Sequence, residues 1–274
     1  MFRTVLPSLL FYAQAAGHTG YAAFKAGRGR LDNPGLVRGS HALRRALESV
    51  GVRFEISGLD AIDCQSGPYV FVANHMSALE TQILPSILQD AAPCTFVVKS
   101  SLLRYPVFGS VLRAFDPIVV NRADPRADLR VVLDEGLMRL RAGTSVIIFP
   151  QAHRTATFSR KTFNSIGMRL ARSACVPMVP IALDTAAWSQ GRWLKDIGWI
   201  TPERPVRFAV GRPIEVGAEG PAAHQETVAF IERTIAGWGL MPPVDLGSAE
   251  VRDDGLHGEA IAISAGAGQA TPAS

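Results

Sequence analysis

The chain has 274 residues, of which 47% are hydrophobic, and this length is enough to bury one sizeable core. Its cysteines, Cys64, Cys94 and Cys175, are odd in number and widely spaced, which argues against a disulfide framework or a cysteine zinc site and favours a reducing cytosol. The net charge is +4, but residues 1–50 carry seven Lys or Arg against two acidic residues. Such a basic surface suits an anionic partner, whether nucleic acid, anionic lipid or an acidic carrier protein.

The first apolar segment spans residues 5–24, and Pro7 and several polar residues interrupt it. It lacks the run of about 18 or more apolar residues that a membrane-spanning helix needs. Three structures fit it: an amphipathic helix packed on the domain, an interfacial membrane helix, or a signal peptide. Arg3 and the "AQA" of residues 13–15 loosely match the last of these.

The sequence "AGRGRLDNPG" (26–35) breaks the chain after this segment. A short basic helix closed by Gly51 is predicted over 41–51. We therefore expect residues 1–50 to form a helical segment that lies close to a membrane.

From residue 51 to 240, short apolar runs alternate with segments of helical periodicity. This pattern predicts an α/β fold whose largely parallel central sheet is covered by helices on both faces. The predicted strands are 69–73, 95–98, 117–120, 145–149, 178–183 and 206–210, and the predicted helices are 77–89, 101–113, 128–141, 163–173 and 222–238. Residues 241–274 are small, polar and aperiodic at their end, and we expect a disordered tail there.

Polar side chains follow three of the predicted strands. His75 follows the first, Arg122 follows the third, and the sequence "QAHR" (151–154) follows the fourth. Ligands of open α/β sheets bind beyond the carboxyl ends of the strands, so these groups are expected to meet at one rim. Arg122 and Arg154 predict a substrate phosphate, because a planar guanidinium can bond two phosphate oxygens at once. The alternative is that each arginine pairs with a surface carboxylate.

His75 and Glu80 allow two interpretations. Ser77 and Glu80 fit a capping box at the start of the next helix, which alone would explain the glutamate. Alternatively, the carboxylate of Glu80 holds the imidazole of His75 in one tautomer, so that its other nitrogen acts as a base on a substrate hydroxyl. No G-x-S-x-G, H-E-x-x-H or Walker A pattern occurs in the sequence. A His–carboxylate pair without a protein nucleophile favours direct attack by a bound alcohol.

Four blocks, in this order, resemble the glycerolipid acyltransferases of the lysophosphatidate acyltransferase type. "NHMSALE" (74–80) is similar to the family's first motif, Asn-His-x4-Asp, and "VVKSSLLRYPVFGSVLRAFDPIVVNR" (97–122) to its second block. "IIFPQAHRT" (147–155) is similar to the third, usually Phe-Pro-Glu-Gly-Thr-Arg, and "VPMVPIAL" (176–183) to the fourth. Together the blocks cover roughly residues 65–215.

The resemblance implies transfer of a fatty acyl group from acyl-CoA or acyl carrier protein to a lysophospholipid hydroxyl, most simply that of 1-acyl-sn-glycerol 3-phosphate. It implies His75 as the general base with Glu80 as its partner, no obligatory metal cofactor and no nucleic-acid partner. The protein is expected on the cytoplasmic side of the cell membrane, bound peripherally or anchored by its N-terminus. The substrate-binding residues would be Asn74, Lys99, Arg122, Gln151, His153 and Arg154, and Pro177 and Pro180 would shape the acyl pocket.

The blocks depart from the family pattern in two places. Glu80 replaces the usual Asp and is one methylene longer, so it needs a different rotamer to reach the ring. In the third block, Gln151, Ala152 and His153 replace Glu, Gly and Thr, which makes the site more positive. The alternatives are therefore acylation of a non-phosphate lipid such as an amino-acid lipid, a catalytically weak lipid-binding protein, and a thioesterase.

Overall fold

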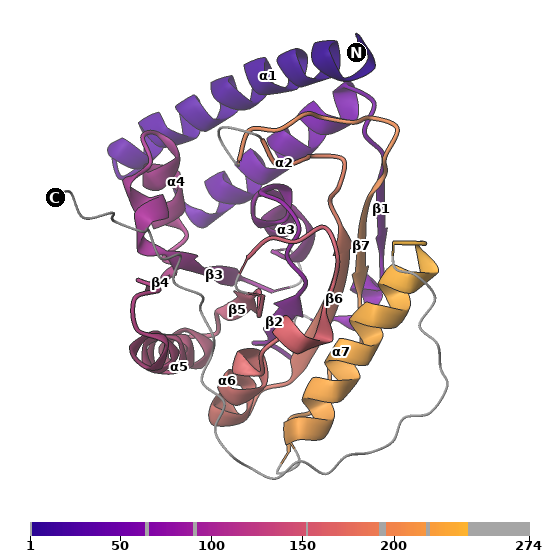
Figure 1. Ribbon diagram of the computed structural model, residues 1–274. Helices are drawn as coiled ribbons and strands as arrows, with labels where there is room; N and C mark the ends of the chain where they lie inside the picture. Colours follow the sequence, from indigo (N-terminus) through magenta and orange to yellow (C-terminus); the bar gives the residue numbers. More distant parts are fainter. Residues whose placement is uncertain are drawn as a thin grey trace, which may run out of the picture.

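The computed structural model describes residues 2–63, 66–89, 92–151, 153–191, 196–217 and 220–240. Its centre is a seven-stranded sheet with the strand order β1-β7-β6-β2-β5-β3-β4 (Figure 1). The strands are β1 (Phe54–Ser57), β2 (Val70–Ala73), β3 (Cys94–Lys99), β4 (Ile118–Val120), β5 (Ser145–Ile148), β6 (Met178–Asp184) and β7 (Val206–Val210). The tail predicted to be disordered, residues 241–274, lies outside the described residues.

Five neighbouring strands, from β6 to β4 in the sheet order, run parallel to one another. β7 pairs antiparallel with β6, and β1 pairs parallel with β7, so these two strands run the opposite way. The prediction of a largely parallel α/β sheet is confirmed. Because β2 lies between β6 and β5, the residues that follow it lie at an inner position of the rim formed by the parallel strands' carboxyl ends.

Helices cover both faces of the sheet (Figure 1). One face carries α1 (Phe2–Gly27), α2 (Asn33–Ser49), α3 (Leu79–Leu88) and α4 (Phe108–Ala114), and the other carries α5 (Pro125–Arg141), α6 (Ile166–Ala174) and α7 (Gly220–Gly237). Along β6, Val179 and Ile181 pack toward the first group of helices, and Met178 and Ala182 toward the second. Burial on both faces explains why the sequence of this strand is almost wholly apolar.

The N-terminal helix α1 is packed into the core of the domain. Phe11 is fully buried in the same cluster as Leu47 of α2, and its ring meets that of Trp188 edge to face at a centroid distance of 5.0 Å. The hydroxyl of Tyr12 donates to the carbonyl of Gly198 at 2.6 Å. Of the three structures that the sequence allowed, the packed amphipathic helix is the one observed. Among the described residues, no helix has the length and hydropathy needed to span a membrane.

The predicted helix 101–113 is broken in the structure. A 3-10 helix ends at Arg104, and α4 begins at Phe108. Between them, Tyr105 takes an extended conformation, as the residue before a proline usually does, and the chain then turns at Val107, whose φ is 65°. The helical periodicity of this segment was correct, but the proline outweighs it.

Two other elements differ from the prediction. α2 begins at Asn33, well before residue 41, because Asp32 caps it by accepting the N–H of Gly35 at 2.9 Å. The strand β1 was missed. It lies at the edge of the sheet and its burial alternates along Phe-Glu-Ile-Ser, so it lacks the apolar run that marks the inner strands.

Candidate active site

The chain leaves β2 at Ala73 and places His75 on the rim, between the ends of β6 and β5. The buried side-chain amide of Asn74 donates to the carbonyl of Leu183 and accepts the N–H of Leu183, both at 2.9 Å. Asn74, expected to bind substrate, therefore faces into the sheet and joins the end of β2 to β6. This double hydrogen bond fixes the backbone from which His75 projects.

The structure brings His75 and Glu80 together. Nδ1 of His75 lies 2.8 Å from Oε1 of Glu80. Because a carboxylate can only accept, Nδ1 carries the proton, and Nε2 of the neutral ring keeps its lone pair. The imidazole also stacks on Phe149, which directly follows β5, with centroids 4.4 Å apart and planes 22° apart. The two contacts fix the ring's orientation and leave one nitrogen able to take a proton.

Glu80 is fully buried and accepts five hydrogen bonds. Besides His75, Oε1 accepts the backbone N–H of Met76 at 2.6 Å and of Ser77 at 2.8 Å. Oε2 accepts the hydroxyls of Ser77 at 3.0 Å and Thr185 at 2.8 Å. Burial raises the pKa of Glu80, but its hydrogen bond to His75, the charge of His75 and the N–H of Ser77 lower it more, so the net shift is downward. Glu80 is therefore ionised at neutral pH.

The two interpretations of Glu80 are compatible. It accepts the backbone N–H of Ser77, as the glutamate of a capping box does, through the same oxygen that faces His75. The hydroxyl of Ser77 accepts the N–H of Leu79 at 3.0 Å, and α3 begins at Leu79, two residues later than predicted. Glu80 thus binds the backbone that leads into α3 and holds the histidine at once.

Gln151 lies beside His75 but points inward, and only 3% of it is exposed. Its Oε1 accepts the backbone N–H of His75 at 2.7 Å, and its Nε2 donates to the hydroxyl of Thr155 at 2.8 Å. That hydroxyl uses its own proton on the carbonyl of Thr157 at 2.7 Å, so the position needs a side chain that both accepts and donates. The amide predicted to bind substrate therefore ties its loop to the backbone of His75. This dual role gives a structural reason for glutamine in place of glutamate.

Basic residues lie at the carboxyl ends of three neighbouring strands, β5, β3 and β4. Lys99 ends β3, Arg122 follows the adjacent strand β4, and both are exposed, as is His153. The backbone N–H of Arg122 donates to Asp128 at 2.7 Å. The pKa of Arg122 is lowered by desolvation and by the charge of Arg154, which together outweigh the opposite effect of Asp128. The charge of Arg154 therefore acts on Arg122, the residue predicted to share a phosphate with it.

Arg154 has a carboxylate beside it. Its Nη1 lies 2.6 Å from Oδ1 of Asp196, although the N–H does not have hydrogen-bond geometry. Asp196 belongs to the connection between β6 and β7, far from Arg154 in the sequence. The alternative in which an arginine pairs with a carboxylate is thus observed for Arg154 in this structure.

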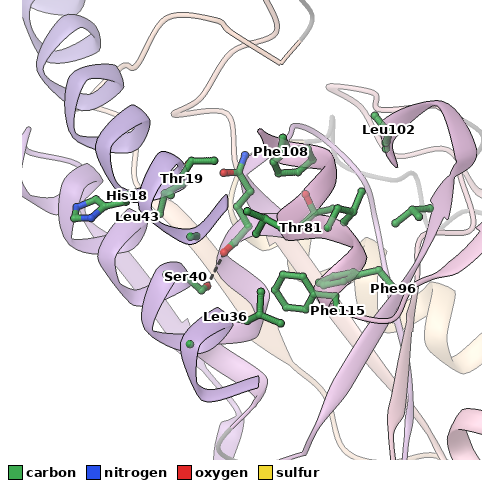
Figure 2. Close-up of a pocket in the computed structure, with 17 residues that line it drawn as sticks. His18, Thr19, Leu36, Ser40, Leu43, Thr81, Phe96, Leu102, Phe108 and Phe115 are labelled. Carbon is green, nitrogen blue, oxygen red and sulfur yellow. Dashed lines mark hydrogen bonds between the residues drawn. The ribbon is translucent and has the colours of Figure 1, made fainter. Parts of the chain in front are cut away.

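An apolar cavity of about 110 Å³ lies between α1, α2 and α4 (Figure 2). Leucine and phenylalanine side chains make up much of its wall: Leu36, Leu43, Phe96, Phe108 and Phe115. Thr81 and Gln82, which follow Glu80 in α3, also line it. The hydroxyl of Ser40 donates to the carbonyl of Gln82 at 2.5 Å and joins α2 to α3 at this wall (Figure 2).

Pro177 and Pro180, predicted to shape an acyl pocket, do not line this cavity. Pro180 lies within β6, and its ring is next to Gly211 and on the side of Phe230 of α7. A Cβ added to Gly211 would come within 2.6 Å of the proline ring and within 3.2 Å of the phenylalanine ring. The ring of Pro180 therefore packs on the face of the sheet opposite to α1–α4. Pro177 precedes the strand, and its carbonyl accepts the N–H of Val70 at 3.1 Å.

Three contacts of the site were not predicted: the stacking of Phe149, the hydroxyl of Thr185 and the carboxylate of Asp196. Thr185 directly follows β6, so the rule that places ligands at strand ends would have pointed to it. No such signal marks Asp196, which lies in an irregular connection. Within the described ranges, no group of three or more His, Cys, Asp or Glu could hold a metal ion.

The sequence model of the family described as Acyltransferase matches residues 48–184. A 1-acyl-sn-glycerol-3-phosphate acyltransferase of Pseudomonas aeruginosa is 30% identical over 190 residues, which cover 68% of this chain and 70% of that protein. A lyso-ornithine lipid O-acyltransferase of the same organism is 28% identical over 116 residues, 42% of this chain and 44% of that protein.

The crystal structure of PlsC, a 1-acyl-sn-glycerophosphate acyltransferase from Thermotoga maritima, is similar with a TM-score of 0.64 and 19% identity. The match covers 87% of this chain and 97% of that one. At this identity the likeness shows a shared fold.

Proposed function

The chain belongs to the acyltransferase family, and from this premise we propose that it transfers a fatty acyl group from a thioester to the free hydroxyl of 1-acyl-sn-glycerol 3-phosphate. The observation that carries the proposal is the 2.8 Å contact between Nδ1 of His75 and the fully buried carboxylate of Glu80. The relative that is 30% identical supports this acceptor. The donor in this proposal is acyl-CoA or acyl carrier protein. The product would be phosphatidic acid, and the reaction would be a step of phospholipid synthesis.

In this proposal, Nε2 of His75 takes the proton of the acceptor hydroxyl while the hydroxyl oxygen attacks the thioester carbonyl. The imidazolium that forms faces the ionised Glu80, which stabilises it. The tetrahedral intermediate then collapses, the C–S bond breaks, and the leaving sulfur takes the proton back from Nε2. An ester, a free thiol and the original neutral imidazole remain.

The acceptor phosphate would bind Arg122 and Arg154. Their mutual repulsion contributes to the lowered pKa of Arg122, and a dianion placed between them would remove it. Lys99 and His153 add further donors at the same rim. The phosphate would take the place beside Arg154 that the carboxylate of Asp196 holds in this structure.

We expect Arg154→Lys to raise KM for the phosphate acceptor by about 10-fold and to leave KM for the thioester nearly unchanged. Lysine keeps the charge but loses the guanidinium fork that bonds two oxygens. Steady-state kinetics with each substrate varied in turn would measure this. Arg160→Lys is the matched control, since that exposed arginine pairs with Glu232 of α7. An equal loss with a phosphate-free acceptor would show that Arg154 serves the architecture.

The cavity between α1, α2 and α4 would hold a fatty acyl chain. Its wall is largely apolar, and it reaches Thr81 and Gln82, the residues next to Glu80 in α3. Burying hydrocarbon there gains about 0.8 kcal/mol per methylene. This proposal replaces the role expected for Pro177 and Pro180, which lie elsewhere in the fold.

A membrane surface would be met by the outer face of α1. Leu6, Leu9 and Leu10 are at least half exposed and follow helical spacing, while Phe11 behind them is buried. Trp199 is also exposed, next to Ile200, whose N–H donates to Ser8 of α1. With the basic surplus of residues 1–50, this pattern suits peripheral binding to the anionic cytoplasmic leaflet of the cell membrane.

Changing Leu6 and Leu9 together to serine should weaken binding to anionic vesicles by at least roughly 10-fold, because two leucines no longer enter the apolar region. Vesicle sedimentation of the full chain measures this, and binding should also fall with added salt. The control is Met138→Ser, which removes a side chain of similar exposure from α5 on the opposite face of the sheet. If both variants bind as the wild type does, the contact lies elsewhere.

A lyso-ornithine lipid is the second candidate acceptor, favoured by the corresponding relative and by the altered third block. The test follows free thiol released from acyl-CoA and from acyl carrier protein with no acceptor, with 1-acyl-sn-glycerol 3-phosphate, or with lyso-ornithine lipid. The proposal expects release that depends on the phosphate acceptor. Release without any acceptor would indicate a thioesterase, and no release with either acceptor would favour a lipid-binding protein.

A further inference from the structure

The two oxygens of Glu80 have partners of different kinds. Oε1 accepts three N–H groups, which all come from residues 75–77 of the same turn. Oε2 accepts hydroxyls alone, one from Ser77 and one from Thr185. Rotation of the carboxylate about its last bond would break both sets, so the hydroxyls on Oε2 help to keep Oε1 aimed at His75.

The two hydroxyls are not equivalent, because each has a single proton. Ser77 has two acceptors within 3.0 Å, Oε2 of Glu80 and Oγ1 of Thr185, and it also accepts the N–H of Leu79. The hydroxyl of Thr185 donates to Oε2 at 2.8 Å, the shorter of the two contacts to that oxygen. Thr185 is thus the more dedicated donor, and it leaves Ser77 free to bond either group.

Thr185 is also held rigidly relative to His75. It is fully buried and directly follows β6, the strand that pairs with β2. Asn74, the residue before His75, bonds both backbone groups of Leu183. Leu183 in turn lies two residues before Thr185. One side-chain amide therefore sets the relative position of the histidine and of the threonine that anchors its partner.

We propose that the hydroxyl of Thr185 is a positioning group for catalysis, which holds the carboxylate of Glu80 against His75. The inference rests on the proposed role of His75 as the base. The longer side chain of Glu80 fits this role of Thr185. An aspartate at position 80 would draw the carboxylate back by one methylene and away from the threonine hydroxyl. No role for this threonine followed from the sequence.

The test compares Thr185→Val, which removes the hydroxyl at nearly constant shape, with Thr185→Ser, which keeps it. We expect Thr185→Val to lower kcat by roughly 10-fold, the effect of a lost hydrogen bond to a buried charge, with KM for both substrates within about twofold. Thr185→Ser should retain most of the wild-type kcat. Thr227→Val is the matched control, since Thr227 is equally buried and donates only to the carbonyl of Ala223 in α7.

A double-mutant cycle shows whether Thr185 acts through Glu80. In a Glu80→Asp background the shortened carboxylate no longer reaches Thr185, so adding Thr185→Val should cost less than about twofold. A full additive loss there, or equal losses in the serine and valine variants, would overturn the inference. If valine disturbs folding, Thr185→Ser and Thr185→Ala give the same comparison, because they differ by one oxygen.

His75→Ala separates this inference from the function on which it rests. If that variant stays active, the base assignment fails, whatever Thr185 does. If His75→Ala is inactive and Thr185→Val has wild-type kcat, the base assignment stands and the positioning role of Thr185 is wrong.

Discussion

Replacing His75 with alanine is expected to lower kcat by about 10²- to 10⁴-fold, the usual contribution of a general base. The fold should survive, because the bonds that place residue 75 are made by its backbone. Its N–H donates to Gln151, and its carbonyl accepts the N–H of Thr155. Glu80 keeps four of its donors when the ring is lost.

The control for this variant is His224→Ala, which removes an imidazole from α7 on the opposite face of the sheet. Its turnover should equal that of the wild type. Circular dichroism and the melting temperature report whether His75→Ala is folded. A folded His75→Ala protein with near-normal turnover would remove His75 from the mechanism.

Glu80→Gln is expected to lower kcat by at least roughly 10²-fold, with a melting temperature close to that of the wild type. The amide oxygen of the glutamine can accept the N–H groups that Oε1 of Glu80 accepts. Its NH₂ can donate to the hydroxyl oxygens of Ser77 and Thr185, once these hydroxyls rotate so that they accept. The cap and the packing are thereby kept. The neutral amide cannot stabilise the imidazolium, and the analogous change of carboxylate to amide in a serine-protease triad costs about 10⁴-fold in kcat.

Glu80→Asp is the informative companion to this variant. It keeps the negative charge, and its loss should be smaller than that of Glu80→Gln even though the shorter side chain retreats from Thr185. Full activity in Glu80→Gln would mean that Glu80 serves only as the helix cap, and that another group balances the charge of His75.

The inner part of the fold could be predicted because its strands are buried on both faces. The apolar run before His75 predicts β2, and the helical pattern after it predicts α3. The strand end that carries the site could therefore be located from the sequence. The short distance in sequence from His75 to Glu80 made their contact predictable as well. β1 and the break at Pro106 were missed, because an edge strand alternates and periodicity alone does not show where the chain turns next to a proline.

The roles of several rim residues could not be predicted, because they depend on contacts between distant segments. Thr185 is 105 residues from Glu80, and Asp196 reaches Arg154 from a connection with no regular pattern. Asn74 and Gln151 lie beside His75 as expected, but their amides bond the backbone of the sheet and of the first motif. The sequence shows which residues are near the histidine, and only the packing shows which way each one faces.

The most direct test of the central claim follows label from acyl-CoA or acyl carrier protein into lipid, with wild-type protein and folded His75→Ala side by side. With 1-acyl-sn-glycerol 3-phosphate as acceptor, the account predicts labelled phosphatidic acid from the wild type. It predicts at least about 10²-fold less from His75→Ala. Equal amounts of labelled phosphatidic acid from the two proteins, or none from the wild type with either donor, would contradict it.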